Sequence, residues 1–395
     1  MSSKKSLEQG LQHLDDGEYA AARVAFRAAR DNSNKGSKDY AGALLWLGSS
    51  EIKLDLSENA RQNLEEAEKE YEKLGKSDNS TEELAQVRTR LGEALTNLDQ
   101  FSAAEQKLEQ ALDTGREACG PYSVQVADTI AMQGLNDVRS NRLDQGEARL
   151  SKSFGMRRGL LGGKHSELAQ SMNQLSFCYS QQGKFAPAEV LARQALEMQE
   201  AIIGSGHPEY GVTLLNLSTV YIKQGRLSRA EPCAEECVDV LKSSLPPAHA
   251  WNIYALDRLG TVMLSTGKNK EARDTYSEAL DLAQRRWGKE SPYTVGSLIG
   301  LGLANLNCQD FRTSEKYLSI ALDLMKGSGT LDTKMEYSLL QQLACSYVFQ
   351  LKISDAVRLV PDSLRARHTA NFNETIDMVN TALDFVGGQI ENLKN

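Results

Sequence analysis

The sequence predicts an all-α protein, a solenoid of about nine helix–turn–helix repeats followed by a capping helix. The first observation is a small residue that recurs at spacings of 38 and 44 residues and then six times at 42 residues. This marker position is occupied by Ala22, Ala60, Ala104, Gly146, Ala188, Ala230, Ala272, Ser314 and Ala356. A fixed period of this length is typical of repeat proteins, in which each repeat buries one face against its neighbours.

Two further columns of small residues keep the same register, which is the second observation. Seven residues after the markers stand Ala29, Ala67, Ala111, Ser153, Ala195, Cys237, Ala279, Ala321 and Ser363. Twelve residues before them stand Gly10, Gly48, Gly92, Gly134, Ser176, Ser218, Gly260, Gly302 and Ala344. Helices approach closely only where side chains are small, and Gly inside a helix costs up to about 1 kcal/mol relative to Ala. We therefore expect all three columns to be buried between helices.

One complete repeat shows the expected order of elements. Residues 207–248 contain a first apolar-periodic run around Leu217, then a turn at residues 224–226, and a second run that begins near Ala230. The period of both runs is that of a helix, and the glycine between them marks a turn. Each repeat is therefore expected to be two helices joined by a tight turn.

These residues carry a resemblance to a known family. In most repeats Leu is followed by Gly or Ser, and the small marker residue comes twelve positions after that Gly or Ser. A bulky residue usually follows four positions after the marker, and Ala usually follows seven positions after it. This pattern resembles the tetratricopeptide repeat. The 42-residue period and the stretch HPEYGVTLLNLSTVYIKQGRLSRAEP resemble the kinesin light chain kind. The resemblance implies a right-handed superhelical solenoid. The expected parts are two irregular repeats at 1–81, seven regular repeats at 82–365, and a capping helix with a tail at 366–395.

Composition excludes some classes of function. With 45 basic and 53 acidic residues the net charge is −8, which disfavours nonspecific binding of nucleic acid. No run of about 18 apolar residues could cross a membrane, and the first residues lack the apolar core of a signal peptide. The six cysteines stand at irregular spacings without a Cys-x-x-Cys pair, so we expect reduced thiols and a cytoplasmic location.

The sequence contains no recognisable catalytic or cofactor motif. His-Glu-x-x-His, Gly-x-Ser-x-Gly and the phosphate-binding glycine loop are all missing. His165, His207 and His249 lie 42 residues apart, so equivalent atoms are about 10 Å apart, too far to share a metal ion whose bonds to nitrogen are about 2 Å long. We expect no enzyme activity, no cofactor and no metal.

Candidate binding residues follow from the resemblance, which implies that the first helix of each repeat lines a concave face. Residues two before and five after the Gly/Ser column lie on one side of that helix. In the seven regular repeats these fourteen positions include amides and four bases but no acid. With Asn173 beside them, the candidate peptide-binding residues are Arg90, Asn97, Arg139, Asn173, Gln174, Gln181, Asn216, Lys223, Arg258 and Asn307.

The expected function is a non-enzymatic scaffold or adaptor that binds an extended, acidic segment of a protein or peptide. The family grips the backbone of such segments with amides and acidic side chains with bases. Seven repeats about 10 Å apart would span of order 60 Å, enough for roughly 18 extended residues. The plainer interpretation is a solvated polar helix face.

Two other functions stay open at this point. The first is co-chaperone-like docking of a C-terminal carboxylate, for which Asn216 and Arg258 match the family's clamp. Asn173, Phe177 and Tyr254 stand where Lys, Asn and Lys would be needed. The second is a structural module that associates with itself into a homo-oligomer through exposed repeat edges.

Overall fold

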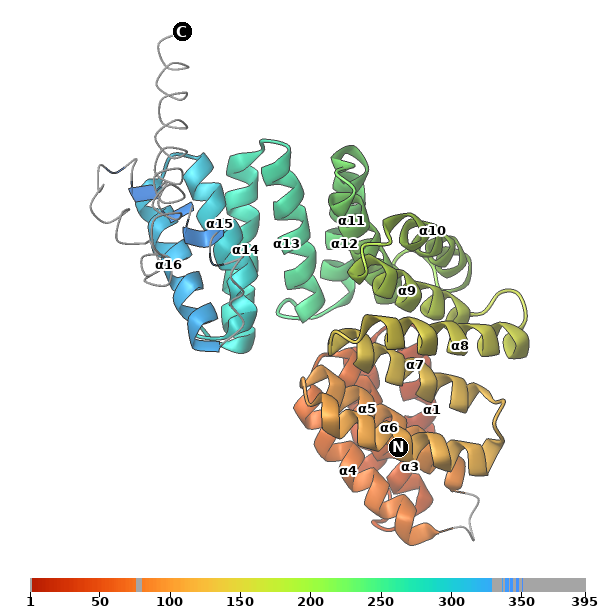
Figure 1. Cartoon of the computed structure of the whole chain (residues 1–395). Helices are drawn as coiled ribbons and strands as arrows, with labels where there is room; N and C mark the ends of the chain where they lie inside the picture. Colours follow the sequence, from red (N-terminus) through yellow and green to blue (C-terminus); the bar gives the residue numbers. More distant parts are fainter. Residues whose placement is uncertain are drawn as a thin grey trace, which may run out of the picture. The chain divides into compact units, whose positions relative to one another are not determined.

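The structure is a computed structural model, and the residues it describes are 2–75, 80–328, 336, 338–340, 342, 343, 346, 347 and 350. Within these residues every regular element is helical, and the helices follow one another in pairs (Figure 1). The all-α solenoid expected from the sequence is confirmed. The capping helix expected at 366–395 and most of the ninth repeat lie outside the described residues.

Sixteen α-helices and one 3-10 helix make up the described part. The first helices of the pairs are α1 (Ser3–Asp15), α3 (Lys38–Lys53), α5 (Thr81–Asn97), α7 (Val124–Arg139), α9 (Ser166–Gln181), α11 (Pro208–Lys223), α13 (Ala250–Ser265) and α15 (Val295–Asn307). The second helices are α2 (Tyr19–Asp31), α4 (Ser57–Leu74), α6 (Phe101–Cys119), α8 (Leu143–Leu161), α10 (Phe185–Ile202), α12 (Leu227–Ser244), α14 (Asn269–Trp287) and α16 (Phe311–Ser328). The short helix η2 (Pro292–Thr294) precedes α15.

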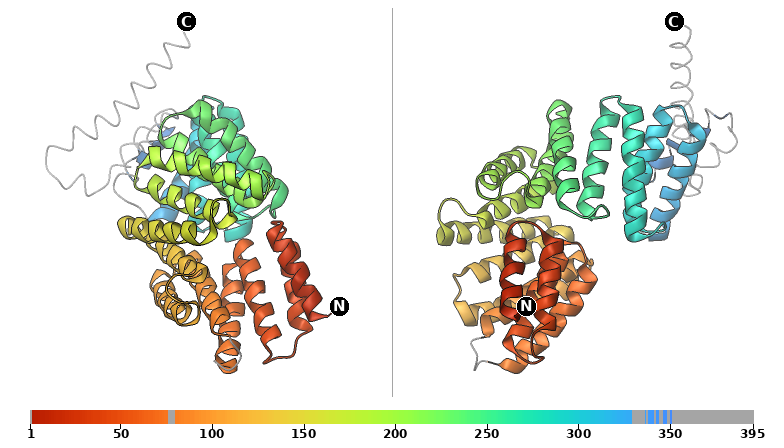
Figure 2. Two further views of the ribbon diagram at one scale, coloured as in Figure 1. Left: turned by 90° about the vertical axis from the view of Figure 1, so that its right-hand side faces the viewer. Right: turned by 180° about the vertical axis from the view of Figure 1, so that it is seen from behind.

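The chain divides into two compact units. Unit 1 is Met1–Trp251 and unit 2 is Asn252–Asn395, so the boundary falls near the start of α13. Figure 2 shows the helical pairs of unit 1 following one another from α1 in red to α12 in green. Each unit is described by itself below.

The three columns of small residues are buried wherever the structure describes them. At the marker and plus-seven positions every described side chain is at most 1% exposed, and Gly146 is buried. Ala344, Ala356 and Ser363 lie outside the described residues. A Cβ atom added to Gly92 would stand 2.5 Å from the Leu108 side chain, and one added to Gly48 would stand 2.6 Å from Leu64. The glycines are therefore required by close packing of the two helices in a repeat.

Two repeats use a different pair of residues at this contact. Where Ser176 and Ser218 replace the glycine, the facing residue four after the marker is Ala192 and Ala234 in place of a bulky side chain. The Ser176 hydroxyl donates to the Ala188 carbonyl at 2.7 Å, so its polar atom is satisfied inside the contact. Glycine with a bulky partner and serine with alanine are thus two ways to fill the same space.

The first helices of unit 1 lie closer to one another than the second helices do. Direct contacts join α1 to α3, α3 to α5, α5 to α7, α7 to α9 and α9 to α11. Among the described residues of unit 1, no contact of comparable extent joins successive second helices. A stack with this asymmetry curves toward its first helices, so their free side forms the inner face of unit 1.

Ion pairs at the turn edge join successive repeats. In three cases the base stands four residues before the marker of its own repeat. Its partner is the glutamate that stands one residue after the marker of the preceding repeat. The pairs are Arg142–Glu105 at 3.2 Å, Lys184–Glu147 at 2.7 Å and Arg226–Glu189 at 2.5 Å. Each is partly exposed and screened by solvent, so its contribution to stability is small. Their main effect is to fix how one repeat sits on the next.

The contact between glycine and a bulky side chain can be tested by replacing the Gly92–Leu108 pair with a serine–alanine pair. Gly92→Ser alone overfills the space beside Leu108 and is expected to lower the free energy of unfolding by about 1–3 kcal/mol. Leu108→Ala alone leaves a cavity and is expected to lower it by about 2–5 kcal/mol. Urea unfolding followed by circular dichroism measures both changes.

The double variant decides whether the two residues act as a pair. Because it recreates the Ser176–Ala192 combination, it is expected to lose clearly less stability than the sum of the two single changes. Additive losses would show that Gly92 and Leu108 do not share one space.

A buried carboxyl group in unit 2 gives a pH-dependent prediction. Asp257 on α13 accepts a hydrogen bond from the Ser297 hydroxyl on α15 at 2.7 Å, and burial raises the pKa of Asp257 from 3.8 to about 6. A raised pKa means that the folded state binds the proton more tightly than the unfolded state. The contribution of Asp257 to the free energy of unfolding should therefore fall by about 1–3 kcal/mol as the pH rises from 3.8 to about 6.

The measurement is urea unfolding of the whole chain across this pH range. Asp257→Asn removes the titration and keeps a polar group of similar size facing Ser297. We expect the pH profile of the variant to be flatter than that of wild type. A variant whose profile matches wild type would contradict the raised pKa.

Candidate functional site

The predicted binding residues all lie on first helices, divided between the two units. In unit 1, Arg90 and Asn97 are on α5, Arg139 is on α7, Asn173, Gln174 and Gln181 are on α9, and Asn216 and Lys223 are on α11. In unit 2, Arg258 is on α13 and Asn307 is on α15. The two sets are therefore considered separately.

Three amides of unit 1 form a group across two neighbouring helices. The Asn216 side-chain nitrogen on α11 donates to the Asn173 side-chain oxygen on α9 at 2.8 Å. Gln174, next to Asn173, is 8% exposed, and its Oε1 has no hydrogen-bond partner among the residues the structure describes. A buried acceptor without a partner is costly, so Gln174 Oε1 is a destabilising feature of this group.

The predicted bases of unit 1 differ in how far they are engaged. Arg90 forms an ion pair with Glu93 at 2.8 Å. Arg139 donates to the Asn97 side-chain oxygen at 2.7 Å and lies 3.3 Å from the Asp99 carboxylate. Lys223 is exposed, and in the described part of the chain it makes no ion pair. The inner face thus already contains carboxylates beside two of its bases.

In unit 2 the two predicted residues occupy different surroundings. Arg258 is half-buried, and its charge acts on the neighbouring Asp257 carboxyl group and lowers its pKa against the larger effect of burial. The Asn307 side chain is exposed and donates to the Asn269 side-chain oxygen at 3.2 Å.

Charged residues converge on the inner face of unit 1, and of these only Arg90 was among the predicted binding residues. We call the following set the inner charge cluster: Lys53 on α3, Arg90 and Glu93 on α5, Asp128 on α7, Arg157 on α8, Glu167 on α9 and Glu209 on α11. Lys53 bonds Glu209 at 2.6 Å, and the charge of Glu93 also acts on Lys53. The charges of Glu93, Asp128 and Glu167 in turn raise the pKa of Arg90. Five successive first helices therefore contribute to one electrostatic group.

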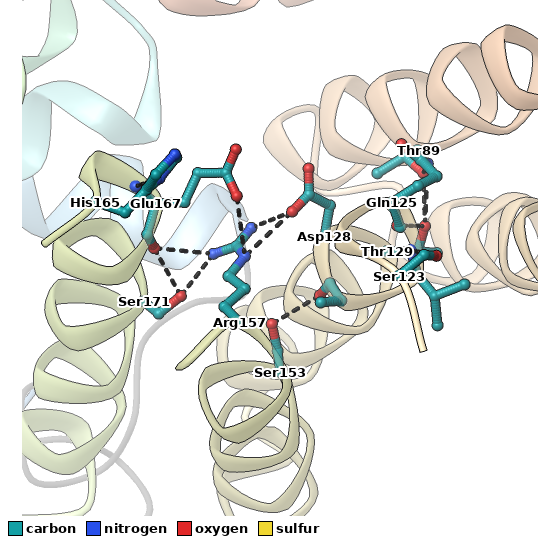
Figure 3. A network of polar contacts seen from close by, with 12 residues as sticks. Thr89, Ser123, Gln125, Asp128, Thr129, Ser153, Arg157, His165, Glu167 and Ser171 are labelled. Carbon is teal, nitrogen blue, oxygen red and sulfur yellow. Dashed lines mark hydrogen bonds and ion pairs between the residues drawn. The ribbon is translucent and has the colours of Figure 1, made fainter. Parts of the chain in front are cut away.

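Arg157 reaches this cluster from a second helix (Figure 3). Its guanidinium is 2% exposed and bonds the Asp128 carboxylate through Nε at 3.1 Å. Its Nη1 donates to the Ser171 hydroxyl at 2.6 Å and to the Glu167 carbonyl at 3.3 Å. A buried arginine needs such a full set of acceptors, and here it joins α7, α8 and α9.

The pKa values in the cluster follow from burial and from the nearest opposite charge. Burial acts to lower the pKa of Lys53, but Glu209, Tyr19 and Glu93 together outweigh it and the pKa is raised. The Lys53 ammonium lowers the pKa of Glu209. Burial and the Asp128 charge raise the pKa of Glu167. Lys53 and Glu209 are thus held as a charged pair.

A signal for the acidic residues was present in the sequence. The position seven residues before Arg90, Gln174 and Asn216 lies on the same helix side and reads Glu83, Glu167 and Glu209. The predicted site used only two positions per helix, and this position is not one of them. Arg157 carries no comparable signal, because it lies on a second helix.

Comparison with known proteins identifies the repeats. Models of the tetratricopeptide repeat family match residues 84–122, 133–201 and 192–243. Together with the helical pairs described above, these matches show that residues 84–122 and 133–243 are tetratricopeptide repeats. The 42-residue repeats of the chain resemble those of the kinesin light chain kind. A sequence comparison with curated proteins finds no match.

Solved structures resemble the fold at low sequence identity. A Rap protein in complex with competence and sporulation factor has a TM-score of 0.60 at 12% identity, covering 97% of this chain and 99% of that chain. A signal transduction ATPase with a tetratricopeptide repeat sensor from Pyrococcus horikoshii has a TM-score of 0.52 at 15% identity, covering 82% of this chain and 48% of that chain. A putative kinesin light chain from Podosopora anserina has a TM-score of 0.43 at 16% identity, covering 52% of this chain and 97% of that chain.

Three further observations concern other kinds of site. In the described residues no helix is long and apolar enough to cross a membrane. The same residues hold no group of three or more His, Cys, Asp or Glu side chains arranged for a metal ion. Five cysteines are free thiols, namely Cys119, Cys178, Cys233, Cys237 and Cys308, and Cys345 lies outside the described residues.

Proposed function

We propose that this chain is a non-enzymatic protein-interaction scaffold that binds an extended segment of a partner on the inner face of unit 1. The observation that carries the proposal is the amide group of Asn173, Gln174 and Asn216, which lies across α9 and α11. An extended backbone offers a donor and an acceptor at each residue, and amide side chains can bond both.

The proposed segment carries acidic side chains. Arg139 and Lys223 are both exposed, at the end of α7, which precedes the amide group, and at the end of α11, which contains Asn216. Carboxylates of the segment would form charge-assisted hydrogen bonds with them. Because these contacts are exposed, each is individually modest and weakens as salt is added.

A structural neighbour supports binding of a factor by a fold of this kind. The Rap protein with a TM-score of 0.60 was solved in complex with competence and sporulation factor. Its 12% identity relates the folds only, so the chemistry of the partner is argued here from Arg139, Lys223 and the amides. The free thiols Cys178 and Cys237 are buried and fit a reducing compartment, which favours a cytoplasmic scaffold.

The two other functions have less support from the described residues. Asn216 and Arg258, which match two positions of the carboxylate clamp, belong to different units. Exposed large apolar side chains are scattered over several helices and loops, for example Val24, Tyr122 and Val190, so they do not define a surface for self-association. We therefore rank segment binding on unit 1 first.

The proposal predicts what a random peptide library displayed on phage will yield. Selection on wild-type protein should enrich peptides rich in Asp and Glu, whose binding weakens with rising salt. Arg139→Glu/Lys223→Glu reverses both exposed bases and should lower the affinity for the enriched peptides at least about tenfold, because two charge-assisted contacts are lost. Fluorescence anisotropy measures the affinity.

The control reverses two bases that lie on second helices. Lys69→Glu/Lys152→Glu makes the same change in net charge on α4 and α8, and both residues are exposed. This variant should bind the enriched peptides nearly as well as wild type. If the Arg139/Lys223 variant keeps wild-type affinity, the inner face of unit 1 is not the binding site.

A further inference from the structure

Two parts of unit 1 that are distant in the sequence meet in a built contact. Lys53, the last residue of α3, donates to the Glu209 carboxylate in the first turn of α11 at 2.6 Å, across 156 positions of sequence. Tyr19, the first residue of α2, packs edge-on against the His207 ring with centroids 6.3 Å apart. The first two repeats therefore contact the repeat that begins at α11.

Packing at this contact is close. Tyr19 is 2% exposed and His207 is 8% exposed. A Cβ atom added to Gly17 would stand 2.6 Å from the Pro208 ring and 2.8 Å from the His207 ring. Gly17 also has a φ of +76°, so a side chain here would meet both strain and a clash. Such an interface differs from a loose contact between two surface loops.

Two histidines lie at the contact. His207 Nδ1 accepts from the Glu209 amide at 3.1 Å, and His249 Nδ1 accepts from the Trp251 amide at 3.1 Å. Each ring therefore carries its proton on Nε2. His249 Nε2 donates to the Lys53 carbonyl at 3.0 Å, and the His207 ring packs against Tyr19.

The regular 42-residue spacing of these histidines thus has a structural meaning. His165, His207 and His249 occupy equivalent positions, and the Nδ1 atom of each accepts an amide two residues later. Two of them also contact the first two repeats: His207 packs against the Tyr19 ring, and His249 bonds the Lys53 carbonyl. One residue type both begins a helix and joins distant repeats.

We propose that these contacts form an intramolecular clasp that closes unit 1, and that opening the clasp admits an acidic segment to the inner face. The clasp consists of Gly17, Tyr19 and Lys53 on one side and His207, Pro208, Glu209 and His249 on the other. The second part, that opening the clasp admits an acidic segment, rests on the proposed function.

Besides Arg139 and Lys223, an acidic segment could bind Lys53 and Arg90, and the closed clasp keeps both of these bases paired. Lys53 is bonded by Glu209, and Arg90 is bonded by Glu93. The two pairs lie near each other, since Glu93 acts on Lys53 and Arg90 acts on Glu209. A carboxylate of the segment can reach Lys53 only if Glu209 leaves it. Glu209 therefore stands where an acidic side chain of the ligand would bind, and binding favours the open clasp.

Hydrogen exchange of the full chain, followed by mass spectrometry, tests the clasp directly. Lys53→Glu and Glu209→Lys should each reduce exchange protection at residues 15–19 and at residues 207–211 together. The charge swap Lys53→Glu/Glu209→Lys should restore protection at both segments. Lys53→Gln is a milder variant, for use if Lys53→Glu does not fold, and should lose protection at the same two segments.

A variant at an exposed site serves as the control for the clasp. Lys69→Glu makes the same charge change at an exposed site on α4 and should leave both segments protected as in wild type. Loss of protection near residue 53 alone, or a charge swap that does not restore protection, would overturn the clasp.

Gating is tested with a fluorescent peptide of ten glutamates. Glu209→Gln frees Lys53 without adding or removing a base, so it should bind this peptide several-fold more tightly than wild type. Glu109→Gln makes the same change at an exposed residue of α6 and should bind as wild type does. Equal binding by wild type and Glu209→Gln would overturn the claim that the clasp controls access of the segment. The clasp itself would still be decided by the hydrogen-exchange experiment. Binding that does not depend on Arg139 and Lys223 would instead overturn the proposed function.

Discussion

Close approach of the two helices within each repeat is the contact on which the rest of the structure depends. It requires a glycine or serine on the first helix and a side chain of matching size on the second, as in Gly92 with Leu108 or Ser176 with Ala192. Because protein interiors are packed as densely as organic crystals, the size of one residue determines the size of the other. Repetition of this contact gives every repeat nearly the same geometry.

Equal geometry places equivalent residues of successive repeats side by side, and this is how the site arises. Asn173 and Asn216 meet because α9 and α11 present nearly the same helix position to the inner face. The same stacking brings charges of five first helices into the inner charge cluster. Curvature toward the first helices then carries α3 to α11, where Lys53 and Glu209 pair. Local packing thus determines both the proposed binding surface and the contact proposed as a clasp.

The sequence predicted those features that depend on a short period and not those that depend on curvature. The helical pairs and the buried small columns follow from spacings of seven and twelve residues within one repeat, so they could be predicted. The pairing of Lys53 with Glu209 spans four repeats, and no pattern in one repeat indicates it. Arg157 was missed because a second-helix residue reaches an inner-face cluster only in three dimensions. Glu93 lay at a position that the two-column interpretation did not consider.

The central claim is that a partner segment binds along the first helices of unit 1, and photo-crosslinking tests it most directly. A peptide selected for binding, with a photoreactive group at successive positions, is crosslinked to the full chain, and the attached residues are identified by mass spectrometry. The account predicts attachment to α7, α9 and α11, centred on Gln174 and Asn216. Attachment concentrated on the second helices, such as α8 and α10, would contradict it.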